Sequence, residues 1–410
     1  AGESSLELLR LKARALDGLG REREAAELYA ELLQKYPGEE SLAFEALNCF
    51  LHCFDYASIK RLLPRLVAGV PQEEAKLVLC IRAAQALRQS EVALQLCERL
   101  VERAPGKPSH PCKLGTIYQS FGRMEEAEEQ FVRALELDPD YQPALYFLAQ
   151  LKKCTAGDNH IPQIECFISR HSGSGSDTSA AHYALAKEFE DIGEYDKAFL
   201  HMDQGAMQMR RRSAYRVEVD RQMFDQLRDW FTASESAVEP GRSGEGPIFI
   251  LGMPRTGSTL VDRVLSSHDQ VSSIGELMCF RRAVEECCDI VEQVDSFADF
   301  FAAASHDLTY RDIGARYLEM VEPLRGKERY FIDKMPMNYA FVGLISRALP
   351  GARFVHTVRN PIDTCFSNYK QMFGEGYYGY SYELGSLAEH YKLYRELMVF
   401  WHRHLPGQVP

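Results

Sequence analysis

Apolar and polar positions in the first 205 residues recur at helical spacing, and proline interrupts them at regular intervals. Four prolines lie 34 residues apart, at Pro37, Pro71, Pro105 and Pro139. Because proline cannot continue a helix, each of these residues marks the end of one. The pattern therefore predicts a helical array with a repeating unit of 34 residues.

The unit that ends at Pro139 shows most clearly which positions recur. They are Leu114, Gly115 and Tyr118 in a first helix, Gly122 at a turn, and Ala127, Phe131 and Ala134 in a second helix. We expect Gly115 and Ala127 to lie where the two helices cross closely, with Tyr118 and Phe131 filling the space beside them. The units that end at Pro71 and Pro105 are less regular, and only the prolines fix their register.

The period and these positions resemble the tetratricopeptide repeat over about residues 4–205. A polar interruption that includes residues 172–179 separates the last unit from the others. Such arrays stack into a superhelix with a concave face. The resemblance implies that the array, residues 1–205, binds a peptide or protein on that face. A purely structural scaffold or a dimerisation surface is the alternative.

A change of composition separates the array from the rest of the chain. A charged helical stretch is followed by a segment rich in Ser, Gly, Glu and Pro, which is typical of a linker. We expect residues 206–244 to form a helical connector and linker. A second domain is then predicted over residues 245–410.

The second domain begins with a strand, a glycine loop and a helix. Ile248–Leu251 is a short apolar run of the kind found in buried parallel strands, residues 252–257 read as a turn, and an amphipathic helix follows from Thr259. This arrangement presents backbone N–H groups and a helix N-terminus to a phosphate. In the nucleotide-binding loop GxxxxGK[ST] a lysine stands where this chain has Ser258, and Arg255 supplies a positive charge instead. The missing lysine argues against ATP hydrolysis.

Three further strands are predicted, and a charged residue follows each of them. They are predicted at Val271–Ile274, Tyr330–Ile332 and Arg353–Val358. After the first of them, Gly275 is expected to form a turn and Glu276 to begin a helix. Asp333 and Lys334 follow the second strand. Arg359 follows the third, before a helix that Asn360 and Pro361 open. Ligands bind at the carboxyl ends of strands in open parallel sheets, so this pattern predicts a binding site there.

The loop and these strand ends resemble the sulfotransferases that use 3′-phosphoadenosine-5′-phosphosulfate (PAPS). The residues that match the family's 5′-phosphosulfate loop are Pro254, Arg255, Thr256, Gly257, Ser258 and Thr259. Glu276 is similar to the general base of the tyrosylprotein sulfotransferase branch. Lys334 matches the lysine that reaches the bridging oxygen of the donor. Arg359 and Ser367, eight residues apart, match the family's 3′-phosphate site.

The whole chain thus resembles tetratricopeptide-repeat-containing sulfotransferases. The resemblance implies an α + α/β architecture, in which an all-α repeat superhelix precedes a P-loop-like α/β domain with a parallel sheet. It implies transfer of a sulfuryl group from PAPS to an acceptor hydroxyl, with 3′-phosphoadenosine-5′-phosphate (PAP) as product and no metal. The repeat array and Glu276 favour a protein or peptide tyrosine as acceptor, whereas a carbohydrate or small-molecule hydroxyl stays open.

Two other function classes remain as alternatives at this point. One is a P-loop nucleotide kinase or hydrolase, and the other is a binding scaffold with an inactive sulfotransferase-like domain. Individual residues also have ordinary structural interpretations. Glu276 could be an acid that the helix N-terminus favours, and Asp333 could be a metal-binding acid of a nucleotidase or a structural partner of Lys334.

The composition of the chain disfavours several other classes of protein. The balance of 47 Lys and Arg against 59 Asp and Glu gives a net charge of −12, which disfavours a nucleic-acid binder. No apolar run approaches the roughly 18 residues that span a bilayer, and the start of the sequence lacks the basic region and apolar core of a signal peptide. The 11 cysteines include no CxxC pair, so we expect reduced thiols and a cytoplasmic protein.

The resemblance also implies a segment that this sequence does not contain. In the family, a further strand and a cofactor-covering segment follow the helix that we expect at Ser386–His404. We therefore expect the sulfotransferase domain to be incomplete at its C-terminal end. The residues that contact adenine are not assigned, and the oligomeric state is not predicted.

Overall fold

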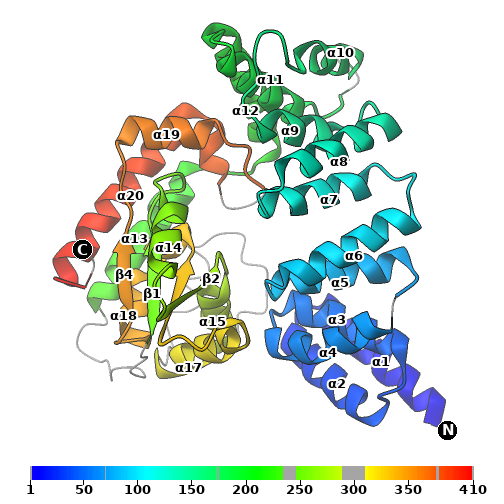
Figure 1. Ribbon diagram of the computed structural model, residues 1–410. Helices are drawn as coiled ribbons and strands as arrows, with labels where there is room; N and C mark the ends of the chain where they lie inside the picture. The colour runs from blue at the N-terminus through cyan, green and yellow to red at the C-terminus, as the bar shows by residue number, and fades with distance from the viewer. Residues whose placement is uncertain are drawn as a thin grey trace. The chain divides into compact units, whose positions relative to one another are not determined.

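The structure is a computed structural model that describes residues 2–69, 71–171, 173, 175–233, 246–288, 310–374 and 378–408 (Figure 1). The chain folds into two compact units. Unit 1 comprises residues 1–68, 216–364 and 388–410, and unit 2 comprises residues 69–215 and 365–387. The domain boundaries predicted at residues 205 and 244 remain predictions, and the second of them lies outside the described residues.

Helices alone form the N-terminal part of the chain, as the periodicity predicts. Those of unit 1 are α1 (Gly2–Gly18), α2 (Glu22–Lys35), α3 (Glu40–His52) and α4 (Tyr56–Ala68). Those of unit 2 are α5 (Glu74–Ala86), α6 (Ser90–Arg103), α7 (Ser109–Ser120), α8 (Met124–Leu137), α9 (Gln142–Leu151), α10 (Ile161–His171), α11 (Ser179–Asp191) and α12 (Tyr195–Arg212). The helices α2, α4, α6 and α8 each end two or three residues before one of the four periodic prolines.

The packing within the pair α7 and α8 follows from its small residues. A Cβ atom added at Gly115 would lie 2.6 Å from the Phe131 ring, so only glycine lets the two helices approach this closely. Ala127 and Phe131 are fully buried in the same contact. The predicted crossing is confirmed.

The turns between paired helices share a left-handed residue. Gly20 and Gly122 have φ angles of 75°, and in the two irregular units Phe54 and Arg88 take the equivalent place with φ angles of 56° and 57°. These four residues lie 34 positions apart. A side chain in this conformation costs about 1–2 kcal/mol, a cost that glycine avoids.

Replacing Arg88 by glycine is expected to stabilise unit 2. The Arg88→Gly variant removes the left-handed strain but makes the unfolded chain more flexible, so a net gain of about 0.5–1 kcal/mol is expected. Thermal unfolding followed by calorimetry measures it. The Arg88→Ala control keeps the strain and is expected to show no gain. An equal gain in both variants would contradict the explanation.

The C-terminal part of unit 1 contains a parallel sheet. Its strands are β1 (Pro247–Leu251), β2 (Val271–Gly275), β3 (Tyr330–Lys334) and β4 (Arg353–His356), in the order β2-β3-β1-β4. All three neighbouring pairs are parallel. All four strands therefore point their carboxyl ends to one edge, with β1 between β3 and β4. The predicted α/β domain with a parallel sheet is confirmed.

Helices cover both faces of this sheet (Figure 1). They include α14 (Ser258–Ser266), α15 (Cys279–Cys287) and α17 (Tyr310–Val321), and further helices of this part are α18 (Val342–Ala348) and α19 (Pro361–Tyr369). Short 3₁₀ segments are η2 (Glu322–Leu324), η3 (Pro336–Phe341) and η4 (Gly379–Tyr382). On one face Phe249 packs against Phe280 of α15 and Tyr317 of α17, with ring centroids 6.2 and 5.6 Å away. Helix α14 contacts β1, β2 and β3.

Two long helices complete unit 1. They are α13 (Val217–Ala233) and α20 (Leu384–His404), whose first residues belong to unit 2. Trp401 of α20 is fully buried and donates its indole N–H to the backbone oxygen of Tyr339, 3.0 Å away. Phe231 of α13 packs edge-on against the same indole. None of the described helices is long and apolar enough to cross a membrane.

Candidate functional site

The glycine loop leaves β1 and is tied to the segment that follows β4. Gly252 has a φ angle of 141°, and a Cβ atom there would lie 2.5 Å from the Thr357 carbonyl oxygen. The Thr357 N–H donates to the Leu251 oxygen at 2.9 Å. The hydroxyl oxygens of Thr256 and Thr357 are 2.7 Å apart. The loop is therefore held in one conformation, and only glycine fits at its first position.

The loop ends at the first residue of α14 without a capping side chain. Arg255 and Gly257 both have positive φ angles, 68° and 93°, and Gly257 occupies the N-cap position with no side-chain hydrogen bond. The N–H groups of the first turn of a helix have no partner inside the helix. Together with the exposed Arg255 and Thr259, they provide an electropositive end that suits a phosphate or sulfate group.

Lys334 and Glu276 form an ion pair beside this loop. Lys334 is the last residue of β3 and is only 6% exposed, whereas the Glu276 side chain is about half exposed. The Lys334 ammonium donates to Glu276 Oε1, and Thr259 Oγ1 lies 3.5 Å from Nζ. The structure thus brings three of the predicted site residues together from β3, α14 and the segment after β2.

The position of Glu276 differs from the prediction in one respect. It was expected at the start of a helix, but it lies in a bend three residues before α15 begins at Cys279. Gly275, with a φ angle of 79°, ends β2 and turns the chain toward Lys334. The position of the Glu276 carboxylate is therefore explained by its ion pair with Lys334. It is not explained by an interaction with the N-terminus of α15.

Asp333 points to the opposite face of the sheet from Lys334, because side chains alternate along a strand. Its carboxylate is fully buried and accepts hydrogen bonds from the Tyr317 hydroxyl at 3.0 Å and from the Asn338 amide at 3.2 Å. Asp333 is thus a structural group, but its partners are Tyr317 and Asn338. The expected pairing with Lys334 was wrong.

Burial raises the pKa of Asp333 to about 7, although both hydrogen bonds lower it. An unfolded Asp has a pKa of about 3.9, so between about pH 4 and pH 7 the folded state holds an extra proton. Folding stability from this group therefore increases as the pH falls through that window, by at most about 1.4 kcal/mol per unit.

The Asp333→Asn variant is expected to lose this pH dependence. Relative to the wild type, it should gain stability as the pH is raised from about 4.5 to 8, since no charge is buried in it. Urea unfolding followed by tryptophan fluorescence measures the difference. Both tryptophans, Trp230 and Trp401, lie in unit 1. A difference between the two proteins that does not change with pH would contradict the prediction.

Arg359 lies on the other side of the loop, after β4. Its guanidinium Nη1 is 3.5 Å from the backbone oxygen of Arg255, and its Nη2 is 3.7 Å from the carboxylate of Asp363. Asn360 caps α19, since its side-chain oxygen accepts from the N–H groups of Ile362 and Asp363. The predicted helix start is confirmed. Strand β4 is two residues shorter than expected, because Thr357 turns toward the loop.

Ser367 is half-buried in the part of α19 that belongs to unit 2. Its pairing with Arg359 on one anion therefore stays a prediction. Pro254 is buried in the loop, and Ser258 is buried at the first position of α14. Ser258 thus presents its backbone N–H at the helix start, where the nucleotide-binding loop would place a lysine.

Sequence reasoning missed Thr357 as a member of this site. The only signal was its place directly after a predicted strand, in a segment that was assigned to the strand itself. It also missed Tyr317, because nothing in a helix 16 residues upstream of Asp333 indicates a contact with it.

The predicted site residues gather several basic groups at one edge of the sheet. Basic side chains from the loop, from β3 and from the segment after β4 surround the start of α14, and one carboxylate faces Lys334. No group of three or more His, Cys, Asp or Glu residues that could hold a metal ion occurs among the described residues.

Comparison with known proteins agrees with this geometry. Residues 247–409 match the sulfotransferase family, and residues 112–141 match the tetratricopeptide repeat. The C-terminal part of the chain is thus similar to the sulfotransferase family, and part of its helical array is similar to the tetratricopeptide repeat. The first match runs from β1 to the end of α20, and the second covers most of α7 and all of α8.

One relative is an uncharacterized protein of Aquifex aeolicus (strain VF5), which is 28% identical over 324 residues. The match covers 77% of this chain and 42% of the relative, so the chain spans about two fifths of the relative's length.

Two solved structures match about half of the chain at low TM-scores. YrrB, described as a TPR protein with an unusual peptide-binding site, is 16% identical with a TM-score of 0.31, covering 46% of this chain and 87% of its own. MamA from Desulfovibrio magneticus RS-1 is also 16% identical, with a TM-score of 0.33, covering 47% of this chain and 96% of its own.

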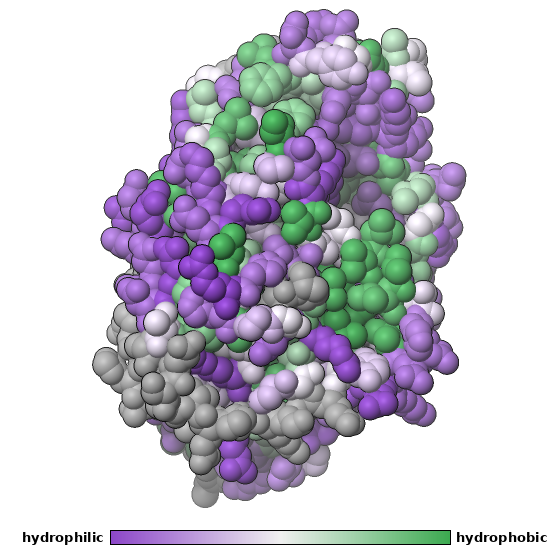
Figure 2. Space-filling view, turned by 90° about the vertical axis from the view of Figure 1, so that its left-hand side faces the viewer, coloured by the Kyte–Doolittle hydropathy of each residue, from purple (hydrophilic) through white to green (hydrophobic). Residues whose placement is uncertain are grey.

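Exposed apolar side chains occur on the two helices that begin at the sulfotransferase-family site. Leu260 and Val264 on α14 are 69% and 62% exposed, and Ile362 on α19 is 77% exposed. Figure 2 shows apolar side chains gathered in one area of a mostly polar face of the molecule. Apolar surface is thus available next to the charged residues of the site.

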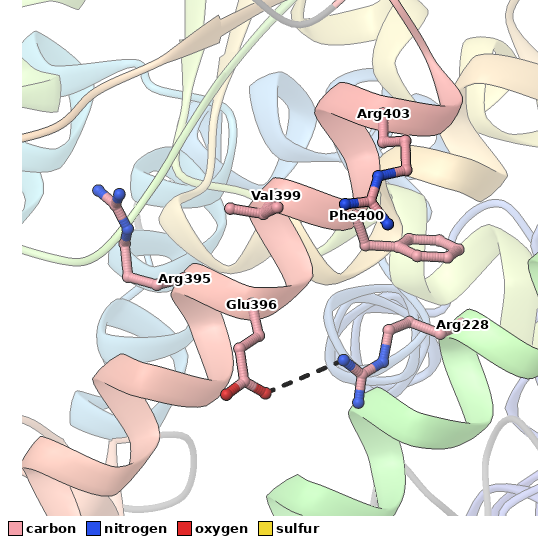
Figure 3. Close-up of a pocket in the computed structure, with 6 residues that line it drawn as sticks. All are labelled: Arg228, Arg395, Glu396, Val399, Phe400 and Arg403. Carbon is pink, nitrogen blue, oxygen red and sulfur yellow. Dashed lines mark ion pairs between the residues drawn. The ribbon is translucent and has the colours of Figure 1, made fainter.

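A separate hollow of about 410 Å³ lies between α13 and α20 of the same unit. It is lined by Arg228, Arg395, Glu396, Val399, Phe400 and Arg403. Arg228 faces Glu396 across it at 3.9 Å, while Arg395 points away from the others (Figure 3). None of the predicted site residues lines this hollow, so it is distinct from the sulfotransferase-family site.

Proposed function

We propose that this chain transfers a sulfuryl group from PAPS to an acceptor hydroxyl. The observation that carries the proposal is the Lys334–Glu276 pair, set directly beside an uncapped helix start in a sulfotransferase-family domain. A phosphate site alone would suit many nucleotide-binding proteins. Here a carboxylate and an ammonium also face each other at the edge of the phosphate site. The carboxylate can serve as a base for the acceptor, and the ammonium as a cation for the leaving group.

The residues present fit the donor by their chemistry. Gly252 keeps the loop close to the segment after β4, and the uncapped turn of α14 offers N–H groups to an anion. When bound, PAPS supplies an activated sulfuryl group on a 5′-phosphate. In the proposal the loop residues 254–259 hold that phosphosulfate, and Arg359 with Ser367 holds the 3′-phosphate. The 3′-phosphate contact would select PAPS over ATP, because a guanidinium binds phosphate strongly.

Glu276 acts as the general base in this proposal. A neutral hydroxyl is a poor nucleophile, and a carboxylate that takes its proton in the transition state typically accelerates transfer by about 10²–10⁴-fold. The Glu276 side chain is exposed enough to reach an incoming hydroxyl. Lys334, Arg255 and the loop N–H groups stabilise the negative charge that grows on the leaving oxygen. These fixed cations do the work for which a nucleotide hydrolase uses magnesium, so the proposal includes no metal.

A protein or peptide tyrosine is the acceptor that we favour. Tetratricopeptide repeats suit binding of a peptide or protein, and the exposed apolar residues on α14 and α19 suit an acceptor carried on a larger molecule. We also propose that the protein acts on such acceptors in the cytoplasm.

Isothermal titration calorimetry with PAP in EDTA, and separately with ATP and magnesium, tests the proposal. PAP is expected to bind without metal, and ATP with magnesium is expected to bind weakly. The reverse result would place the loop among nucleotide hydrolases. If neither ligand bound, even to a chain extended at its C-terminus, the scaffold alternative would replace the enzyme. Where PAP binds, incubation with PAPS and tyrosine-containing peptides, compared with sugars, identifies the acceptor.

A further inference from the structure

The helices α2 and α4 of the repeat array contact elements that flank the sheet within unit 1. Their contacts fall on α15, which follows Glu276 in the chain, and on α17 and η2, which precede the strand that ends at Lys334. Lys60 of α4 donates to the backbone oxygen of Pro323 at 2.7 Å. The first repeats are therefore part of the unit that contains the site.

One contact is made directly behind Glu276. Cys279, the first residue of α15, is fully buried three residues after Glu276. Tyr56, the first residue of α4, is 4% exposed, and burial together with the neighbouring Cys279 raises its pKa. Burial raises the pKa of both groups, so both stay neutral and protonated. The residue three positions after Glu276 is thus a neighbour of the first residue of a repeat helix.

A second contact is an ion-pair chain that starts on α2. Glu22 pairs with Arg282 of α15, and Arg282 also pairs with Glu286 at 3.2 Å. Glu286 in turn pairs with Arg316 of α17 at 2.6 Å. The side chain of Glu286 is only 6% exposed, and those of Glu22, Arg282 and Arg316 are between 19% and 25% exposed. Ion pairs with this degree of burial are weakly screened by solvent and fix the orientation of α15 and α17.

The second contact continues to Lys334. The residue after Arg316 is Tyr317, whose hydroxyl is bonded to Asp333, and Asp333 directly precedes Lys334. Chains of contacts therefore connect both members of the Lys334–Glu276 pair to α2 and α4.

From these contacts we infer that Glu22 and Tyr56 are positioning residues for the Lys334–Glu276 pair, so that the first repeats complete the catalytic site. The inference rests on the proposed function. It assigns to these repeats a role that differs from peptide binding, since it uses their buried contacts with α15. A small displacement of a catalytic group lowers the rate strongly, because the reacting atoms must be aligned.

The test compares Glu22→Gln and Tyr56→Phe with the wild type. Each variant removes one charge or one hydroxyl and keeps the size of the side chain. The kcat for transfer from PAPS is expected to fall about tenfold, whereas the affinity for PAP measured by calorimetry stays within about twofold. Glu24→Gln is the matched control on α2, because Glu24 is exposed and pairs only with Arg21 of its own helix among the contacts described.

Two further arms separate positioning from stability. In a Glu276→Gln, Lys334→Ala background the two substitutions are expected to have no further effect on kcat, since they act through this pair. Gly122→Ala, which strains a turn in unit 2 (φ 75°), is expected to lower stability without lowering kcat. A fall in kcat that persists when both Glu276 and Lys334 are replaced, or that Gly122→Ala reproduces, would overturn the inference.

Hydrogen exchange gives a readout that does not depend on activity. Amides in residues 271–288 are expected to exchange faster in Glu22→Gln and Tyr56→Phe than in the wild type and in Glu24→Gln. Unchanged exchange would overturn the inference whether or not the protein is a sulfotransferase. A wild type that fails to bind PAP, with faster exchange in both variants, would contradict only the proposed function.

Discussion

The Lys334→Ala variant is expected to transfer sulfuryl groups about 10²–10³ times more slowly than the wild type. This is the loss observed when one preorganised donor to a developing negative charge is removed from an active site. Lys334 is 6% exposed, belongs to β3 and pairs with Glu276. Water therefore cannot easily take over the role of its ammonium. A single-turnover measurement with PAPS and saturating acceptor gives the rate of the chemical step.

Lys327→Ala is the matched control for this variant. Lys327 is exposed, lies seven residues upstream of Lys334, and lacks any contact with the site among the described residues. Removal of Lys334 leaves Glu276 half exposed to water, so the fold is expected to survive. Urea unfolding followed by tryptophan fluorescence checks this. A Lys334→Ala protein that turned over at the wild-type rate would refute the proposed role.

The Glu276→Gln variant is expected to lower the transfer rate by about 10²–10⁴-fold, since glutamine keeps the shape of the side chain but cannot take a proton. The same substitution should not weaken the binding of the product PAP. The carboxylate competes with a bound phosphate for the Lys334 ammonium, so its removal should leave PAP affinity unchanged or increase it. Rate and affinity measured on one preparation distinguish this result from general damage.

Glu322→Gln makes the same chemical change at an exposed position that pairs with Arg325. It is expected to behave as the wild type in both measurements. If Glu276→Gln weakened PAP binding and left the transfer rate intact, Glu276 would be a binding residue, and another group would have to act as base.

Local signals made much of the helical array predictable from the sequence. Regularly spaced prolines follow the helix ends, so the register of the irregular units could be placed by Pro71 and Pro105, whereas Pro64 lies inside α4. The left-handed turns at Phe54 and Arg88 could not be predicted in this way. Neither residue favours that conformation, and the packing of the flanking helices imposes it.

The candidate site was predictable in part for a similar reason. Parallel strands bring their carboxyl ends to one edge, so residues that follow each strand had to gather there. Which of them touch depends on the strand order. Because β3 lies between β2 and β1, Lys334 meets Glu276 on one side and the loop on the other. The interpretation of Asp333 as a partner of Lys334 failed because neighbours along a strand face opposite sides of the sheet.

By itself the sequence determined the 34-residue helical repeat, the strand–loop–helix that follows the linker, and the charged residues at the strand ends, since these depend on local backbone preferences and on hydrophobic spacing. Only the tertiary structure decided that Lys334 pairs with Glu276, that Thr357 fixes the glycine loop, and that α2 and α4 lie behind α15 in unit 1. These contacts join residues that are far apart in the chain. Their formation depends on which buried surfaces fit together, and no local pattern in the sequence encodes that fit.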